Sequence, residues 1–254
     1  MSIVNSPNGR DAVKYAIISD IHGNLAALQQ SLNRIDELHC DRIVCLGDIV
    51  GYGPFPNECC KVIQDRADAS IAGNHDHAAI DRISTHYFNK YAKAAMEWTI
   101  EKLSDENKEF LRDLPMKFVD QDLLFVHASP PDPAAWDYVL SLYDAEIAFN
   151  AFENHACFIG HSHHPIAFSY EDGEFPRVER LPNVKFFSGF RYIINVGSVG
   201  QPRDENRDAS FGIYDSEERM FELVRQPYNI KETQEAMVRQ NLPTFLIERL
   251  AFGR

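Results

Sequence analysis

Five short apolar segments of this sequence are each followed within two residues by Asp, Asn or His, and this pattern constrains the fold more than any other feature. The segments cover residues 15–18, 42–46, 69–72, 123–126 and 157–159. Their β-branched and aromatic residues predict buried strands, and amphipathic helical spacing at 24–38 and 57–66 separates the first three. Strands alternating with helices are typical of parallel pairing in an α/β fold. The carboxyl ends of such strands meet at one edge, so we expect a polar site there.

The rest of the chain continues the pattern without a repeat or a linker. Further strands are expected at 166–170, 192–196, 211–214 and 220–225, the last two forming a hairpin, and further helices at 88–103, 140–154 and 231–250. Ser104 is expected to cap another helix, and Pro243 to kink or split the last one. Residues 77–114 lack strand character. We therefore expect a single domain over residues 1–254, with 77–114 as a candidate helical cap over the cleft.

The polar residues behind the five strands are all oxygen or nitrogen donors. They are Asp20, His22, Asp48, Asn74, His127, His161 and His163. Asp20 and His22 are two residues apart, so strand geometry would point both to one side, and His161 and His163 repeat this spacing. One such motif alone is more often a capped turn, but five in order favour a metal site for Mn, Fe, Zn or Ni. Seven ligands exceed one tetrahedral site, whereas two metal ions sharing a carboxylate would use them all.

These motifs resemble those of a known enzyme family. Asp20-x-His22, Gly47-Asp48-x-x-Gly51, Gly73-Asn74-His75-Asp76, His127 and Gly160-His161-x-His163 are similar, in order, to the signature of the calcineurin-like metallophosphoesterases. Other segments resemble the bacterial predicted-phosphodiesterase branch, similar to YfcE. The resemblance implies a four-layer α/β/β/α sandwich of two mixed β-sheets flanked by helices, with a dinuclear site at one edge.

The resemblance also assigns roles by position. One metal ion would be held by Asp20, His22, Asp48 and His163, and the other by Asp48, Asn74, His127 and His161, with Asp48 bridging. His75 corresponds to the general acid of the family. The implied cofactors are two divalent or trivalent metal ions, with Mn or Fe favoured over Zn or Ni.

Two such ions would activate a shared water and draw charge from the phosphoryl oxygens during in-line attack. We therefore expect a metal-dependent phosphoesterase, and our first hypothesis is that it acts on phosphodiesters. The alternatives are a phosphomonoesterase, acting on phosphoproteins or diadenosine polyphosphates, and a catalytically silent metal-binding scaffold.

Two charged residues near the motifs have competing interpretations. Asp76 could orient His75 as part of the catalytic pair, or it could cap the following helix. Arg203 could clamp a phosphate bidentately, or it could form an ion pair with Asp204 or Glu205.

Several ring side chains are candidates for substrate contacts. His77 and Tyr52 border the motifs and could touch substrate, although packing in a turn is an adequate role for Tyr52. Trp136, Tyr138 and Tyr143 could stack on a base or an aryl group, or could simply pack in the core.

Composition limits the partners. The chain has 38 acidic and 25 basic residues, a formal net charge of −13, so it would repel a polyphosphate backbone and is not expected to bind nucleic acid stably. No run approaches the ~18 apolar residues of a membrane span, and residues 1–14 are polar, without the apolar stretch typical of a signal peptide. The five cysteines are odd in number and show no metal-knuckle spacing, which favours reduced thiols. We expect a cytoplasmic protein that acts on a small phosphoester; the sequence does not indicate an oligomeric state.

Overall fold

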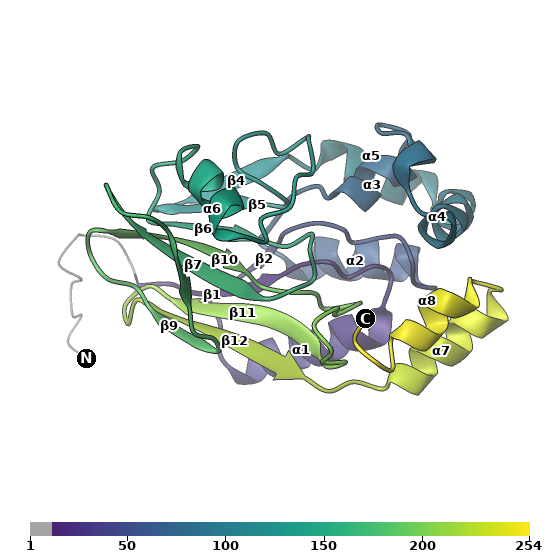
Figure 1. The fold of residues 1–254 in the computed structure, drawn as a ribbon. Coiled ribbons are helices and arrows are strands. Elements are labelled where there is room, and N and C mark those ends of the chain that lie inside the picture. Colours follow the sequence, from purple (N-terminus) through teal and green to yellow (C-terminus); the bar gives the residue numbers. More distant parts are fainter. Residues whose placement is uncertain (1–11) are drawn as a thin grey trace.

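Two six-stranded β-sheets packed face to face form the centre of the protein, which is described here over residues 12–254 by a computed structural model (Figure 1). The first sheet has the order β3 (Ala69–Ser70), β2 (Arg42–Cys45), β1 (Lys14–Ile18), β11 (Ala209–Asp215), β12 (Met220–Gln226) and β9 (Asn183–Lys185). The second has the order β4 (Lys117–Asp120), β5 (Leu123–Val126), β6 (Ala156–Ile159), β10 (Phe190–Asn195), β7 (Ile166–Glu171) and β8 (Arg177–Glu179).

Each sheet mixes parallel and antiparallel pairs. In the first sheet β1, β2 and β3 pair in parallel, and in the second β5, β6 and β10 do so. The predicted hairpin is confirmed, because β11 and β12 pair antiparallel from Ala209 opposite Gln226 to Asp215 opposite Met220.

Alternating side chains along the strands create the layers. In β1, Tyr15 and Ile17 point into the core between the sheets, whereas Ala16 and Ile18 pack on the outer side. The outer face of the first sheet is covered by α1 (Leu25–Glu37) and α2 (Pro56–Arg66), and that of the second by α6 (Leu142–Phe149) (Figure 1). The two mixed sheets flanked by helices confirm the expected fold class.

Residues 77–114 are mainly helical. They include most of α3 (Asn74–Ala79), the 3₁₀ turn η1 (Thr85–Tyr87), α4 (Lys90–Lys102) and α5 (Asp105–Asp113). Ser104 caps α5, as predicted, by accepting a hydrogen bond from the Asn107 amide.

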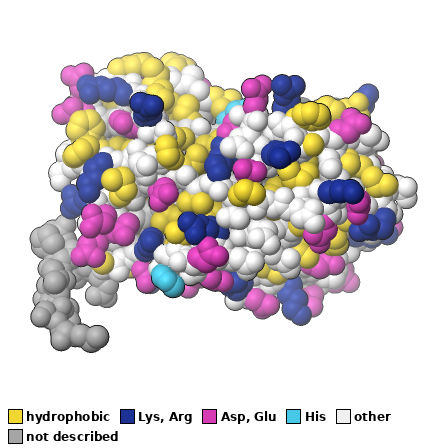
Figure 2. Space-filling model, turned by 90° about the horizontal axis from the view of Figure 1, so that it is seen from below, with side chains coloured by type: hydrophobic (Ala, Val, Ile, Leu, Met, Phe, Trp, Pro, Cys, Tyr) yellow, Lys and Arg dark blue, Asp and Glu magenta, His cyan; other side chains and the backbone are white. Residues whose placement is uncertain are grey.

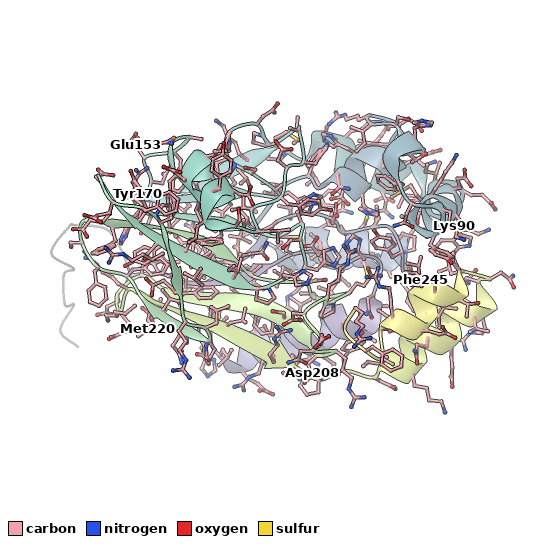
Figure 3. All side chains as sticks on the ribbon, viewed as in Figure 1. Lys90, Glu153, Tyr170, Asp208, Met220 and Phe245 are labelled. Carbon is pink, nitrogen blue, oxygen red and sulfur yellow. The ribbon has the colours of Figure 1, made fainter. Side chains whose placement is uncertain are left out.

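The C-terminal helix is split, as one of the two expected outcomes, into α7 (Ile230–Arg239) and α8 (Thr244–Arg249), with Pro243 at the start of α8. Figure 3 shows Lys90 of α4 and Phe245 of α8 at the same end of the molecule, where Tyr91 stacks on Phe245 with ring centroids 4.7 Å apart.

Other boundaries differ from the prediction. The helix expected at 140–154 covers only Leu142–Phe149, and β3 has only two residues. The short strands β4, β8 and β9 were not predicted. Within residues 12–254, no helix combines the length and the hydropathy that crossing a membrane requires. On the face seen in Figure 2, Lys and Arg side chains are interspersed with Asp and Glu.

Candidate metal centre

Five of the seven donor residues lie in turns beyond the strand ends, in left-handed backbone conformations, whereas Asn74 begins α3 and His127 directly follows β5. β1 ends at Ile18, and Asp20 and His22 have φ angles of 53° and 50°. His161 and His163, after the end of β6, have φ angles of 64° and 60°. The expectation that strand geometry aligns each pair was therefore wrong. The pairs converge because alternate residues of a turn take up a conformation that non-glycine residues rarely adopt, a form of strain common at functional sites.

Two glycines let these turns lie against the carboxylates. A Cβ atom on Gly160 would lie 2.5 Å from Oδ2 of Asp20, and one on Gly73 would lie 2.1 Å from Oδ1 of Asp48. Any larger residue would displace the carboxylate, so the glycines permit the close approach.

The donors form two clusters, and Asp48 lies next to both. In the first, Nε2 of His163 lies 3.2 Å from Oδ1 of Asp20 and 3.1 Å from Nε2 of His22. The second contains Asp48, His127 and His161. Oδ2 of Asp48 lies 3.4 Å from Nε2 of His127 and 3.6 Å from Nε2 of His22. Asp48 thus lies between the clusters, in the position of a shared ligand.

Main-chain carbonyl groups fix the orientation of the imidazoles. Nδ1 of His22, His127 and His163 donates to the carbonyl oxygens of Val50, Leu46 and Gln201, at 3.1, 2.8 and 2.6 Å respectively. In the neutral form of each ring, this bond leaves Nε2 unprotonated and facing the centre. His161 is reversed, because its Nε2 donates to the carbonyl of Trp136 at 2.9 Å and leaves Nδ1 available.

The unpaired atoms at the centre fit metal ions. Oδ1 of Asp20, Oδ1 of Asn74 and Nε2 of His127 are buried without a hydrogen-bond partner among the described residues. An unsatisfied buried polar atom costs about 1–3 kcal/mol, and a cation would supply the missing partner for all three. Carboxylate, amide and imidazole donors suit Mn, Fe, Zn or Ni.

The carboxylates at the centre are ionised. Burial alone would raise the pKa of Asp20 and Asp48, but nearby imidazoles, mainly His163 for Asp20 and His127 for Asp48, outweigh burial and hold both pKa values below the usual range. The same attraction acts on His127, where burial is outweighed by Asp48 and the pKa rises to about 9. The metal centre therefore presents two anionic ligands, Asp20 and Asp48, at neutral pH.

A cavity of about 620 Å³ opens over the donors. Asp48, Asn74, His161 and His163 contribute to its lining, together with the substrate-site candidates Tyr52 and Arg203. Its size lies within the range of small-molecule sites.

His75 also lines this cavity and lies beside the centre. Its main-chain amide donates to Oδ1 of Asp48 at 2.7 Å, and its side chain lies within possible metal-ligand range of His22 and Asp48. Burial lowers the pKa of His75 to about 4, although the Asp48 carboxylate opposes the shift. The imidazole is therefore neutral at pH 7, and an anionic ester in the cavity would favour its protonated form.

Asp76 does not orient His75. One oxygen of its carboxylate accepts from the amides of Ile49 and Val50, and the other accepts from the amide of Gly73 at the start of α3. These contacts match the capping alternative. They correct the assignment of Asp76 as a catalytic partner, since the carboxylate is used to hold two loops together.

Arg203 has no carboxylate partner among the described residues. Asp204 pairs with Arg225 and Glu205 pairs with Arg254, so neither expected ion pair forms. Instead Nη2 of Arg203 donates to Oε1 of Gln201 at 3.0 Å and to the hydroxyl of Tyr52 at 3.4 Å. Its cationic group is thus held at the cavity but not neutralised.

The other ring candidates divide into two groups. Tyr52, Trp136 and Tyr138 line the cavity, whereas His77 does not and packs edge-on against Trp136, at 5.4 Å between centroids. Sequence reasoning missed Phe88, which lines the cavity and lies 4.9 Å from the ring of His75. No local signal separates Phe88 from an ordinary residue of a helical segment.

Residues 13–219 match the calcineurin-like phosphoesterase superfamily domain. The chain belongs to this superfamily. The match covers most of the chain and confirms the superfamily predicted from the five motifs. As a calcineurin-like phosphoesterase, the protein belongs to a metal-dependent family, and its two donor clusters could hold such ions.

Three individual proteins are similar to the chain in sequence or in fold. The chain is 41% identical over 243 residues to the uncharacterized protein MJ0912 of Methanocaldococcus jannaschii, covering 94% of this chain and 98% of that protein. It is 39% identical to a metallophosphoesterase from Sphaerobacter thermophilus, with a TM-score of 0.84 over 96% of this chain and all of the other. The hypothetical protein PH1004 from Pyrococcus horikoshii OT3 shares the fold, with 23% identity and a TM-score of 0.78 over 95% of this chain and 99% of the other.

Proposed function

We propose that this calcineurin-like phosphoesterase is a metal-dependent phosphodiesterase for small substrates. The observation that carries the proposal is the position of Asp48, between two donor clusters and beneath a cavity that also contains His75 and Arg203.

Each residue has a defined task in this proposal. Asp20, His22, Asp48 and His163 would hold one ion, and Asp48, Asn74, His127 and His161 the other. Such ions lower the pKa of water and withdraw charge from the phosphoryl oxygens. Arg203 would bind a phosphate oxygen through its unpaired guanidinium group and fix the orientation of the ester. His75 would donate a proton to the leaving oxygen, since it lines the cavity next to Asn74.

The lining of the cavity supports a diester. Arg203 is the one Lys or Arg side chain among the described lining residues, and Phe88, Trp136 and Tyr138 add apolar surface. A diester carries two organic groups, and the apolar surface offers contacts for the second group, which a monoester lacks. The negative charge of the whole chain also favours a small ester over a long nucleic acid.

The test compares bis-p-nitrophenyl phosphate with p-nitrophenyl phosphate, using protein loaded with Mn and analysed for metal content. A higher kcat/KM for the diester supports the proposal. A preference for the monoester would establish the phosphomonoesterase alternative. Metal-loaded protein that hydrolyses no phosphoester would favour the silent scaffold. Parallel loading with Fe, Zn and Ni would then rank the metals.

A further inference from the structure

Three of the residues that line the cavity are Phe, Trp and Tyr, and neither metal binding nor phosphate binding accounts for them. Phe88 lines the cavity just before α4, and Trp136 and Tyr138 line it from the loop between β5 and α6. Ile83 and Ala92 add further apolar surface on the side of Phe88. The cavity therefore combines a charged centre with apolar walls, as expected for a site that binds an organic phosphate.

Tyr138 is the most informative of these residues. Its ring stacks on the imidazole of His161, with centroids 4.3 Å apart and an interplanar angle of 15°. Half of the side chain is nevertheless exposed, at 50%. Since His161 lies against one face of the ring, the opposite face is the one that a flat ligand in the cavity could cover. A tyrosine used only for core packing would bury both faces.

Phe88 lies next to a residue that is proposed to act in the reaction. Its ring lies 4.9 Å from that of His75, the residue proposed to protonate the leaving group. An organic group that departs next to His75 would therefore lie against Phe88. Trp136 is close to the donor clusters, with its ring edge-on to His127 at 6.0 Å.

We propose that the cavity selects phosphoesters that carry a planar aromatic group, either an aryl group or a nucleobase, which stacks on the free face of Tyr138. This inference rests on the proposed function, because it places the phosphate of the same substrate at Arg203 and the metal centre. Flat rings gain energy from offset stacking on tyrosine beyond their apolar area, whereas saturated rings of the same size do not.

The experiment measures binding of phosphonates, whose P–C bond is not a phosphoester bond, to Mn-loaded protein by calorimetry. Benzylphosphonate and cyclohexylmethylphosphonate have nearly the same size and charge and differ in the aromatic ring. We expect benzylphosphonate to bind about 3- to 10-fold more tightly. An acyclic phosphonate carrying adenine provides the nucleobase arm, and the tighter of the two aromatic ligands identifies the source of the ring.

Two variants test the role of Tyr138. Tyr138→Leu should abolish the preference for benzylphosphonate, and Tyr143→Leu, a change at a 66% exposed tyrosine that does not line the cavity, should retain it. Because Tyr138 contacts His161, metal content is measured in each variant. If Tyr138→Leu loses metal, the Phe88→Leu variant is used in its place, and it should weaken the preference for benzylphosphonate.

The outcomes separate the two proposals. Equal affinity for benzylphosphonate and cyclohexylmethylphosphonate overturns the aromatic selectivity. So does a preference for benzylphosphonate that persists in both Tyr138→Leu and Phe88→Leu. Neither result bears on the phosphodiesterase proposal, which the hydrolysis assay tests. Binding of no phosphonate, together with no hydrolysis of any phosphoester, overturns both.

Discussion

Arg203 offers the sharpest test of substrate binding, because its cationic group lies at the cavity without a carboxylate partner. Its hydrogen bonds go to the neutral groups of Gln201 and Tyr52, and its guanidinium carbon lies 5.7 Å from the centroid of the Tyr52 ring. Nε is buried without a hydrogen-bond partner among the described residues. Arg203 forms no ion pair among the described residues, so its replacement by Ala leaves no carboxylate without a partner.

The expected loss follows from the number of bonds to phosphate. A hydrogen bond to a charged group contributes about 1.5–3 kcal/mol. One or two such bonds from the guanidinium group correspond to roughly 1.5–6 kcal/mol, or about 10- to 25,000-fold in kcat/KM. Arg203→Lys retains the charge but not the planar pair of donors, so its activity should lie between wild type and Arg203→Ala.

The assay is hydrolysis of bis-p-nitrophenyl phosphate by Mn-loaded protein, with metal content measured in each variant. Arg207→Ala is the matched control, because Arg207 is an exposed arginine in the same loop that does not line the cavity. We expect Arg203→Ala to keep its metal and lose activity, and Arg207→Ala to keep both. A loss of less than threefold in Arg203→Ala, at full metal content, would refute a role in phosphate binding.

Four further predictions test other parts of the molecule. Asp48→Asn should reduce metal content at both clusters, because Oδ2 faces both; full occupancy by elemental analysis would contradict this. His75→Ala should keep its metal and slow turnover about 10²–10⁴-fold, most strongly for poor leaving groups, whereas a small uniform loss across a leaving-group series would argue against an acid role. Gly73→Ala should lower the free energy of unfolding in urea by about 1–3 kcal/mol, because its Cβ would lie 2.1 Å from Oδ1 of Asp48; an unchanged midpoint would exclude this clash. Burial raises the pKa of Tyr228 to about 12, so the folded state favours the neutral phenol, and this stability is complete below pH 10 and lost as the pH rises toward 12, by roughly 3 kcal/mol. Urea titrations between pH 8 and 12 should show a smaller decline for Tyr228→Phe, and equal declines would be inconsistent with this account.

The sequence predicts the central strands and the donor set because both depend on local patterns. A buried strand requires a continuous apolar run, and the residues after such runs lie at the carboxyl ends of parallel strands. The expectation of one edge was incomplete, because β1, β2 and β3 belong to the first sheet and β5 and β6 to the second. Edge strands such as β8 carry no such signal, since their side chains are largely exposed and the burial of alternate residues is incomplete. The left-handed turns at Asp20 and His161 are also hidden, because non-glycine residues give no local indication of a positive φ.

Partners of charged residues could not be predicted from proximity in sequence. Asp204 adjoins Arg203 but pairs with Arg225, which lies on β12 and is brought next to the loop by the hairpin. The pair is 21 residues apart in the chain. A pairing of this kind depends on the register of β11 and β12, and only the folded sheet reveals that it leaves Arg203 free.

The two halves of the site have different structural origins, and this bears on what sets substrate choice. The metal donors follow the ends of strands, and all of them lie within the 13–219 superfamily match. The cavity wall depends in addition on residues beyond it, because Tyr52 and Ala92 pack in one buried cluster with Met237 of α7 and Leu246 of α8. Tyr52 also contacts the donor His22, with ring centroids 4.6 Å apart, so a change in α7 or α8 that moves Tyr52 would reach the metal centre as well. We infer that α4, rather than Tyr52, is the part of the wall through which substrate selectivity can vary with the least effect on the metal donors.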